Sequence, residues 1–207
     1  MKNLRGIRVY RDDLPEDTRF KKSVAIDTET MGLLHKRDRL CLVQLSEGDG
    51  VCHLVQMSHP IRPAPNLTRM LLDRSVEKIF HYARFDLASL YLWLGVLCEG
   101  PIYCTKIASR LTRTYTDHHG LKALCRELLG TDISKNEQSS DWGAEALTDG
   151  QKSYAASDVL YLHGLKGRLD VLLTREGRYE LFQSICQFLP TRVILDISGF
   201  PEDIFAH

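Results

Sequence analysis

Residues 24–30 read VAIDTET, and this stretch indicates both the fold class and the chemistry. Three apolar residues are followed at once by Asp27 and Glu29, in a run with the composition of a β-strand. Side chains two positions apart on a strand lie on the same face of the sheet. Two carboxylates on one face repel each other, and an unpaired buried carboxylate is costly. We therefore expect a cation between them.

Two more acids lie in apolar surroundings later in the chain: Asp86 in HYARFDLASL and Asp158 in YAASDVLYL. Tyr154 precedes Asp158 by four residues, which places both on one face of a helix. Hard carboxylate oxygens suit Mg²⁺ or Mn²⁺, and the sequence has no histidine and cysteine cluster for zinc. The acids and the tyrosine together predict a phosphodiesterase site with two metal ions.

Each of these motifs alone has an ordinary structural explanation. A DTE tripeptide occurs on many protein surfaces, and a tyrosine four residues before an aspartate is common on exposed helices. Asp86 can be read as a helix N-cap, because LASLYLW follows it directly. The combination, in this order and at these ends of elements, favours an active site.

The composition predicts one domain over residues 1–207 and a small substrate. A chain of 207 residues with 43% hydrophobic composition can bury one good core and is short for two. Its 27 lysines and arginines balance 27 acids. Proteins that hold long nucleic acids usually have a basic excess, so the balance favours a short substrate or a local basic patch, and residues 1–22 do lean basic.

The six cysteines form no CxxC pair and most lie in apolar runs, so we expect buried, reduced thiols. The N-terminal stretch has no apolar core of a secretory signal. No window approaches the roughly 18 uninterrupted apolar residues of a membrane span. These features predict a soluble, cytoplasmic protein.

The chain is expected to form three strands and then alternate helices with strands, which predicts an α/β sandwich with a mixed sheet. The acids would then converge at one edge of that sheet. The first three expected strands cover 23–28, 40–45 and 51–55, are antiparallel neighbours, and have the turn EGDG (47–50) between the last two. A helix over 66–72 capped by Asn66, a strand over 78–80, and helices over 86–94 and 120–129 follow, the last ended by Gly130. The remaining expected elements are a helix from the capping box Thr148–Gln151 to about 165, helical structure over 169–189 broken near Gly177, and an extended segment over 193–197.

The order DTE, HxxxFD and YxxxD resembles the DEDD 3′-to-5′ exonucleases, in the subgroup with tyrosine in the third motif. The segments KNEQSSDW (135–142) and LTDGQKSYAASDVLYL (147–162) are similar to ribonuclease D. The resemblance covers roughly residues 20–190. It implies a ribonuclease H-like fold, with a mixed sheet flanked by helices.

The family's scheme also implies a role for each acid. Asp27, Glu29 and Asp158 hold one Mg²⁺ or Mn²⁺ ion, and Asp27 also contacts the second. Asp86 acts mainly through metal-bound water, and Tyr154 orients the attacking water. The leaving group is the 3′ oxygen of the penultimate nucleotide.

We expect no room in residues 190–207 for the helical domains that follow the nuclease domain of ribonuclease D. In this the chain resembles the short nanoRNase C-type members of the family, which cleave very short oligoribonucleotides. That resemblance implies a short RNA substrate and an octameric homo-oligomeric ring. The alternatives are ribonuclease D-like trimming of structured RNA 3′ ends, an exonuclease that also accepts DNA, and a catalytically silent nucleic-acid-binding module.

Several residues around the motifs are candidates for substrate binding. Thr28 and Gly32 flank the first motif, and Leu33 would wedge between two bases, a stacking contact that reads no sequence. The alternative for Leu33 is a place in the core. His81 would contact the terminal ribose or a phosphate, or would simply cap a strand.

A polar loop before the third motif offers a lysine, an amide and hydroxyls, which suit a phosphate clamp that limits substrate length. Its candidate residues are Lys135, Gln138, Ser139 and Ser140. An ordinary solvated loop is the alternative.

The C-terminal segment 190–207 carries apolar residues after the last expected core helix, including Val193, Phe200 and Phe205. Large exposed apolar patches usually mark interfaces. The segment therefore predicts contacts in an oligomer, with packing back onto its own domain as the alternative.

Overall fold

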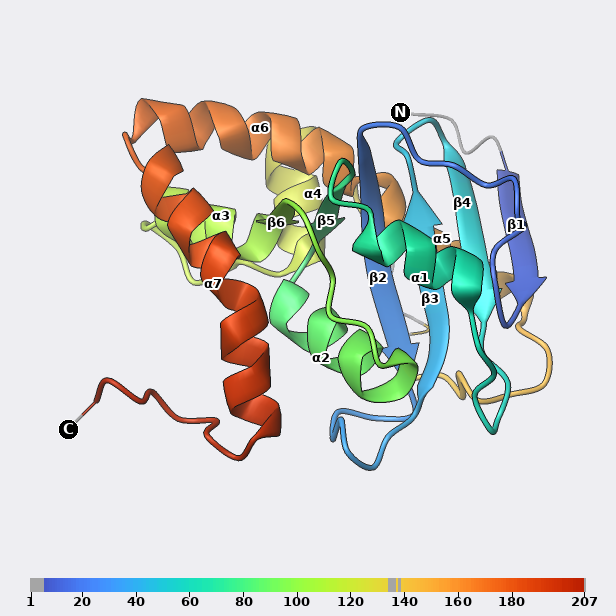
Figure 1. Cartoon of the computed structure of the whole chain (residues 1–207). Coiled ribbons are helices and arrows are strands. Elements are labelled where there is room, and N and C mark those ends of the chain that lie inside the picture. The colour runs from blue at the N-terminus through green and yellow to red at the C-terminus, as the bar shows by residue number, and fades with distance from the viewer. Residues whose placement is uncertain (1–5, 134–136, 138, 207) are drawn as a thin grey trace.

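A computed structural model describes residues 6–133, 137 and 139–206. Four strands come first, helices and strands then alternate, and the last five elements are all helices (Figure 1). The elements in order are β1 (Gly6–Arg11), β2 (Ser23–Thr30), β3 (Leu40–Ser46), β4 (Val51–Gln56), α1 (Pro65–Leu72), β5 (Glu77–Phe80), α2 (Ala83–Leu94), β6 (Ile102–Cys104), α3 (Thr105–Thr112), α4 (Leu121–Leu129), α5 (Asp149–Leu160), α6 (Leu162–Arg175) and α7 (Tyr179–Ile197).

The strands form one mixed sheet in the order β1-β4-β3-β2-β5-β6. The pairs β2–β3 and β3–β4 are antiparallel, while β2, β5 and β6 run parallel to one another. The expected mixed sheet and the hairpin between β3 and β4 are confirmed. The expectation that the chain opens with these three strands is wrong, because β1 precedes them and pairs in parallel with β4.

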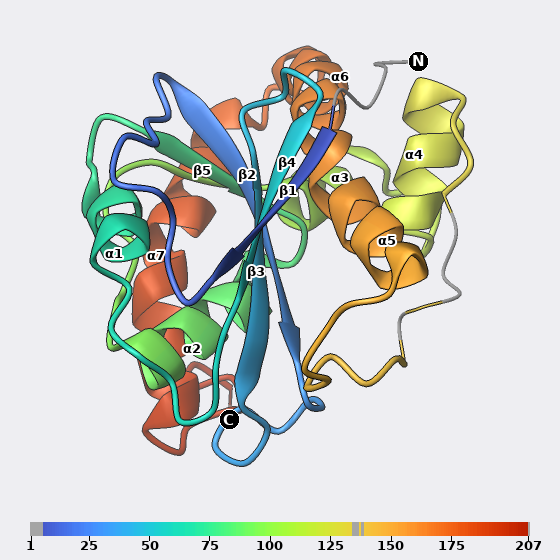
Figure 2. The same cartoon turned by 90° about the vertical axis from the view of Figure 1, so that its right-hand side faces the viewer.

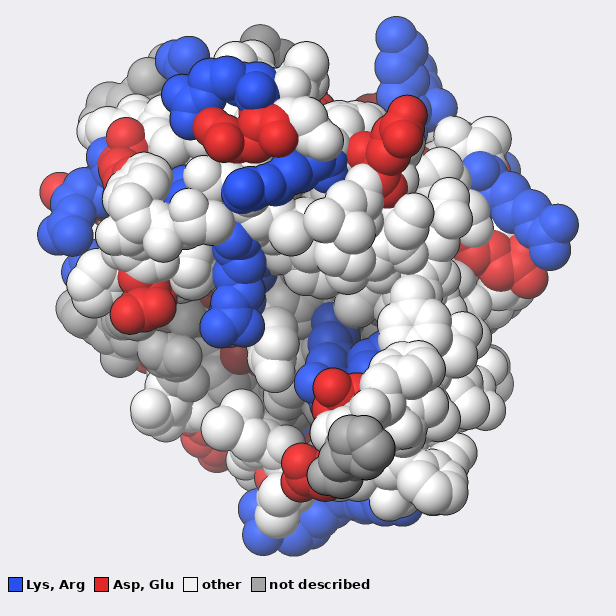
Figure 3. Space-filling view, turned by 90° about the vertical axis from the view of Figure 1, so that its left-hand side faces the viewer, with Lys and Arg blue, Asp and Glu red and all other residues white. Residues whose placement is uncertain are grey.

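Helices cover both faces of the sheet (Figure 2). Helix α5 contacts β2, β3 and β4 on one face, and α2 contacts β2, β3 and β5 on the other. Helices α3, α6 and α7 pack together beyond the β5–β6 side of the sheet. The face that these three helices present has lysine, arginine and acidic side chains interspersed, with no single large patch of one sign (Figure 3).

Strand β2 separates from its neighbour β5 before its carboxyl end. Pairing between β2 and β5 stops at Ala25 and Ile79, whereas pairing between β2 and β3 continues to Thr30. The last residues of β2, which include Asp27 and Glu29, therefore have a strand neighbour on one side only. In mixed α/β sheets, ligands bind where strand connections lead to opposite sides, beyond the carboxyl ends of the strands.

The segment expected to be extended at 193–197 is instead the end of α7, which contains Pro190 within the helix. Val193 is fully buried, and the Asp196 carboxylate accepts hydrogen bonds from Arg84 on α2 and from Arg192 one turn earlier. Tertiary packing and this ion pair outweigh the strand preference of the β-branched residues. The break near Gly177 is confirmed, since α6 ends at Arg175 and α7 begins at Tyr179.

Three element boundaries also differ from expectation. Ala64 is the N-cap of α1, while the Asn66 side chain binds Asp13 and Leu14. Helix α2 begins at Ala83, so the N-cap reading of Asp86 is wrong. The long helix expected after residue 148 is two helices that meet at Tyr161, and neither β6 nor α3 was expected.

The core fills both sides of the sheet, and all six cysteines are buried within it as free thiols, as expected. Gly130 ends α4 in the left-handed conformation, which confirms its expected position. Across the described helices, none combines the length and apolar character needed to span a membrane.

Candidate active site

Three carboxylates meet where β2 separates from β5. One oxygen each from Asp27, Glu29 and Asp158 lies within 4.8 Å of the others, and all three residues are partly buried. Asp27 and Glu29 come from one face of β2, and Asp158 comes from α5, which packs on that face. The structure thus brings together acids that lie about 130 residues apart in the chain.

Helix α5 is held in place at its start. The Thr148 side chain accepts from the Gln151 backbone N–H at 3.1 Å, and the Gln151 side chain accepts from the Thr148 N–H at 2.9 Å. This confirms the expected capping box. Gln151 also donates to the Asp141 carbonyl, and the neighbouring Trp142 is buried with its ring 5.9 Å from the Tyr154 ring. The loop before α5 therefore fixes the helix that carries Tyr154.

Gln44 on β3 is a site residue that the sequence reasoning missed. It pairs with Asp27 across the β2–β3 ladder and is fully buried. Its side-chain Nε2 donates to Asp27 Oδ2 at 3.2 Å and to Glu29 Oε1 at 3.4 Å. Its position in the otherwise apolar run LCLVQL could have indicated this role, because a buried amide side chain needs a hydrogen-bond partner.

Asp86 approaches from the opposite face of the sheet. It lies in the first turn of α2, is 2% exposed, and accepts a 2.7 Å hydrogen bond from the hydroxyl of Thr28. Thr28 alternates with Asp27 and Glu29 on β2, so it faces α2 while they face α5. The buried hydroxyl of Thr28 thus positions Asp86, and a contact between Thr28 and substrate stays a prediction.

The four acids strongly affect one another. Burial, and then repulsion from the other three acids, keeps the pKa of Asp27 well above its ordinary value. Burial followed by repulsion from Asp158 raises the pKa of Glu29 to about 9. Burial raises the pKa of Asp86 to about 8 and that of Asp158 to about 7. Within the described residues, no lysine or arginine forms an ion pair with any of the four.

Leu33 lies in the loop that follows β2 and is 80% exposed, so the core alternative for this residue is wrong. The loop is closed by the buried Asp38, whose carboxylate accepts the Leu34 backbone N–H at 2.9 Å. A Cβ atom at Gly32 would collide with this carboxylate, so a side chain at position 32 would have to displace Asp38 from its bond to Leu34. The loop thus presents an apolar side chain to solvent on a defined backbone.

His81 follows β5 directly and forms a 2.9 Å hydrogen bond with Thr105 at the start of α3. Ser139 is exposed, and the Ser140 hydroxyl bonds to Glu137 within the same loop. Lys135 and Gln138 lie outside the described residues. Because β2 and β5 are parallel, His81 lies at the same edge of the sheet as the acids.

The three carboxylates of Asp27, Glu29 and Asp158 fit a hard divalent cation as ligands. They offer several carboxylate oxygens with a negative charge that burial makes costly, and no lysine or arginine in the described part of the chain pairs with them. The protein would hold a divalent cation such as Mg²⁺ through Asp27, Glu29 and Asp158. Such ions favour hydrolysis at phosphorus.

We expect the metal-free protein to lose stability as the pH rises. The raised pKa values mean that the folded state binds more protons than the unfolded state. The acid cluster's contribution to stability is therefore complete below the unfolded pKa near 4, falls as the pH rises above that value, and is fully lost once the pH passes the folded-state values of about 7 to 9.

Melting temperatures measured in chelator between pH 5 and 9 should fall more steeply for the wild type than for Asp158→Asn. Added Mg²⁺ should raise the melting temperature of the wild type at pH 8 and not that of the variant. Asp149→Asn, an exposed acid on the same helix, is the control and should behave like the wild type. Equal responses of Asp158→Asn and the wild type to Mg²⁺ would contradict the assignment.

Comparisons with known proteins agree with this geometry. A family model described as a 3′-5′ exonuclease matches residues 12–174. Ribonuclease D of Gluconacetobacter diazotrophicus is 35% identical over 165 residues, which is 80% of this chain and 41% of that protein. The chain thus spans less than half the length of this curated relative.

Solved structures are similar over the whole fold. NrnC of Brucella melitensis superposes with a TM-score of 0.92 and 54% identity, covering 97% of this chain and 98% of that one. That protein has also been solved with bound Mg²⁺ and bound to pGG. RNase D of Escherichia coli gives a TM-score of 0.74 and 28% identity, over 84% of this chain and 45% of its own.

These matches confirm the ribonuclease D-like relationship and the exonuclease fold that the three motifs predicted. The motif residues lie at one edge of one sheet, in a chain that is covered by the family model over most of its length. The chain therefore belongs to the family of 3′-5′ exonucleases.

Proposed function

We propose that this enzyme is a metal-dependent 3′-to-5′ exoribonuclease that hydrolyses short oligoribonucleotides to 5′-mononucleotides. The observation that carries the proposal is the meeting of the Asp27, Glu29 and Asp158 carboxylates within 4.8 Å, one helical turn from Tyr154. The 54% identity to an NrnC solved with pGG supports a short substrate. Six buried free thiols suit the reducing cytoplasm.

The acids divide between two ions in this proposal. Asp27, Glu29 and Asp158 would hold one ion, Asp27 would also serve the second, and the Asp86 carboxylate would add negative charge from the α2 side. Bound Mg²⁺ or Mn²⁺ would supply positive charge that stabilises negative charge developing on the phosphate and favours deprotonation of an attacking water. Gln44 Nε2, which donates to both Asp27 and Glu29, keeps their side chains in one orientation.

Tyr154 orients the attacking water through its hydroxyl. Burial and the neighbouring carboxylates raise the pKa of Tyr154 above its ordinary value, so the phenol stays protonated at neutral pH. It therefore acts as a hydrogen-bonding group and not as a base. Packing against Trp142 fixes the direction of the ring.

Substrate contacts come from segments beside the acids. Leu33, exposed on its closed loop, packs between the bases of the last two nucleotides. The loop with Lys135, Gln138 and Ser139 binds a 5′-phosphate and so favours the shortest chains. Trimming of structured RNA 3′ ends is the second candidate, because Escherichia coli RNase D, which has a similar fold, is described as processing structured RNA.

The rate of hydrolysis should fall steeply as the RNA substrate becomes longer than two nucleotides. We expect 5′-phosphorylated dinucleotides to be hydrolysed faster than ten-mers in Mg²⁺ or Mn²⁺, because a phosphate clamp leaves no path for a longer chain. Initial rates on RNAs of two to twenty nucleotides, with matched DNA, measure this. Asp158→Ala is the inactive control. Faster hydrolysis of the longest or of the structured RNAs would favour the second candidate.

Removing the tyrosine hydroxyl should affect turnover and not binding. We expect Tyr154→Phe to lower kcat by about 100-fold or more with little change in KM, because groups that position water contribute at least this much. Tyr161→Phe, at the junction of α5 and α6, is the matched control and should keep its kcat. A loss confined to KM would make Tyr154 a binding residue.

We also propose that the chain forms a homo-oligomer, an octameric ring by resemblance to the nanoRNase C-type enzymes. The segment after α7 supports this. Its backbone is held by Arg84 and Arg192, which donate to the Pro201 and Phe200 carbonyls. The apolar side chains of Phe200 and Phe205 nevertheless stay 57% and 80% exposed, on a tail that projects from the body of the molecule (Figure 1). Exposed aromatic residues on an ordered backbone are typical of interfaces.

Light scattering coupled to gel filtration should give a mass well above the 23.6 kDa of one chain. The double variant Phe200→Asp, Phe205→Asp should reduce that mass, because closed rings depend on one repeated interface. Val171→Asp, which changes an apolar side chain on α6 that is 66% exposed, should not. A wild-type mass of one chain would refute the oligomer.

A further inference from the structure

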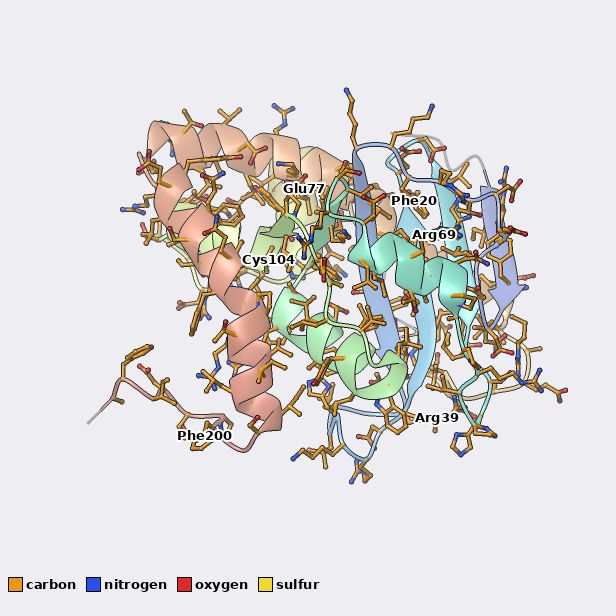
Figure 4. The ribbon with its side chains drawn as sticks, viewed as in Figure 1. Phe20, Arg39, Arg69, Glu77, Cys104 and Phe200 are labelled. Carbon is orange, nitrogen blue, oxygen red and sulfur yellow. The ribbon has the colours of Figure 1, made fainter. Side chains whose placement is uncertain are left out.

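The carboxyl ends of β5 and β6 adjoin the acidic site and carry polar groups that the proposed mechanism does not use. Strands β2, β5 and β6 are parallel, so their carboxyl ends lie at the same edge of the sheet. His81 and Tyr82 follow β5, while Thr105 and Lys106 follow β6. Figure 4 labels Glu77 at the start of β5 and Cys104 at the end of β6, which locates this edge.

Hydrogen bonds at this edge determine where the proton lies on His81. The Thr105 hydroxyl is fully buried and donates to the Phe80 carbonyl at 3.1 Å, a partner that can only accept. A hydroxyl has one proton, so the 2.9 Å contact between Thr105 Oγ1 and His81 Nδ1 must use a proton on the histidine. His81 is therefore the tautomer with Nδ1–H, and its Nε2 is an acceptor.

His81 also stays neutral. Burial, and then the positive charge of Lys106, lower the pKa of His81 to about 3. Lys106 is held nearby, with its ammonium 4.0 Å from the centre of the Tyr82 ring. Among the described residues, Nε2 of His81 has no hydrogen-bond partner, and it is not one of the buried unsatisfied atoms. His81 directly follows β5, which is parallel to β2, so this acceptor belongs to a residue at the edge of the sheet that holds the acids.

The chemistry of a nucleotide leaves few donors for such an acceptor. Phosphate oxygens only accept hydrogen bonds and would be repelled by Nε2, whereas a ribose hydroxyl can donate. We propose that His81 Nε2 accepts a hydrogen bond from a ribose hydroxyl of the substrate, and that Thr105 is the positioning residue that fixes the required tautomer. This inference rests on the proposed function, and it assigns His81 to the sugar and not to a phosphate.

Substrates that lack single hydroxyls test the contact. The set is the dinucleotide pApA and its versions without the 2′-hydroxyl of either nucleotide or the 3′-hydroxyl of the last. In the wild type we expect one deletion to lower kcat/KM about tenfold, since a site built around a hydroxyl rejects the analogue that lacks it. His81→Ala should act less well on pApA and lose this discrimination to within about twofold.

Matched variants separate the contact from a general effect on folding. His53→Ala removes a histidine on β4 whose Nδ1 is likewise bonded to a hydroxyl, that of Tyr10, and should keep the wild-type discrimination. Thr105→Val preserves the shape of the residue and removes its hydroxyl. It should reduce discrimination in the same substrate as His81→Ala. If His81→Ala fails to fold, Thr105→Val carries the test.

Nitrogen-15 NMR of the imidazoles at pH 7 gives a readout that does not depend on activity. Nδ1 of His81 should be protonated in the wild type and should lose that preference in Thr105→Val. A proton on Nε2 in the wild type, or equal discrimination by wild type and His81→Ala, overturns the inference. If the wild type hydrolyses none of the substrates, the proposed function fails. The dissociation constants of the same set, measured with Asp158→Asn, then decide the inference separately.

Discussion

Repulsion between the carboxylates of Asp27, Glu29 and Asp158 has to be balanced whenever the chain is folded. The protein's own residues balance it only in part, through the amide of Gln44 and through raised pKa values that favour protonation. No basic side chain among the described residues pairs with these acids. A fold that concentrates negative charge without a cationic side chain leaves room for a divalent ion, and this need links the stability of the site to its chemistry.

The sheet topology makes this concentration possible. Strand β2 is paired on both sides at its start, but it leaves β5 after Ala25 while it stays with β3 to Thr30. The free side of its last residues admits Asp86 from α2 on one face, and α5 brings Asp158 to the other. A fully paired β2 would close the space between the two faces. The same departure places the ends of β5 and β6, with His81, beside the acids.

The sequence predicted the elements whose signals are local. Apolar runs and a turn motif indicated β3 and β4, a capping box located the start of α5, and three motifs predicted the acids and Tyr154 as site residues. Features that depend on tertiary contacts were missed. The end of α7 has a strand-like composition and is helical because Val193 is buried and Asp196 is paired. Gln44 became a site residue only when the register placed it opposite Asp27.

Helix α7, whose last turns the sequence predicted wrongly, also holds the part of the site that comes from α2. Arg84, two residues before Asp86, makes two hydrogen bonds to Asp196 at 2.5 and 2.6 Å, and Arg192 binds the same carboxylate. Paired, two-point contacts of this kind fix orientation as well as distance. The backbone of the exposed tail after α7 is bound to the same two arginines. The position of Asp86 and the presentation of the tail's aromatic residues therefore depend on one ion-pair network.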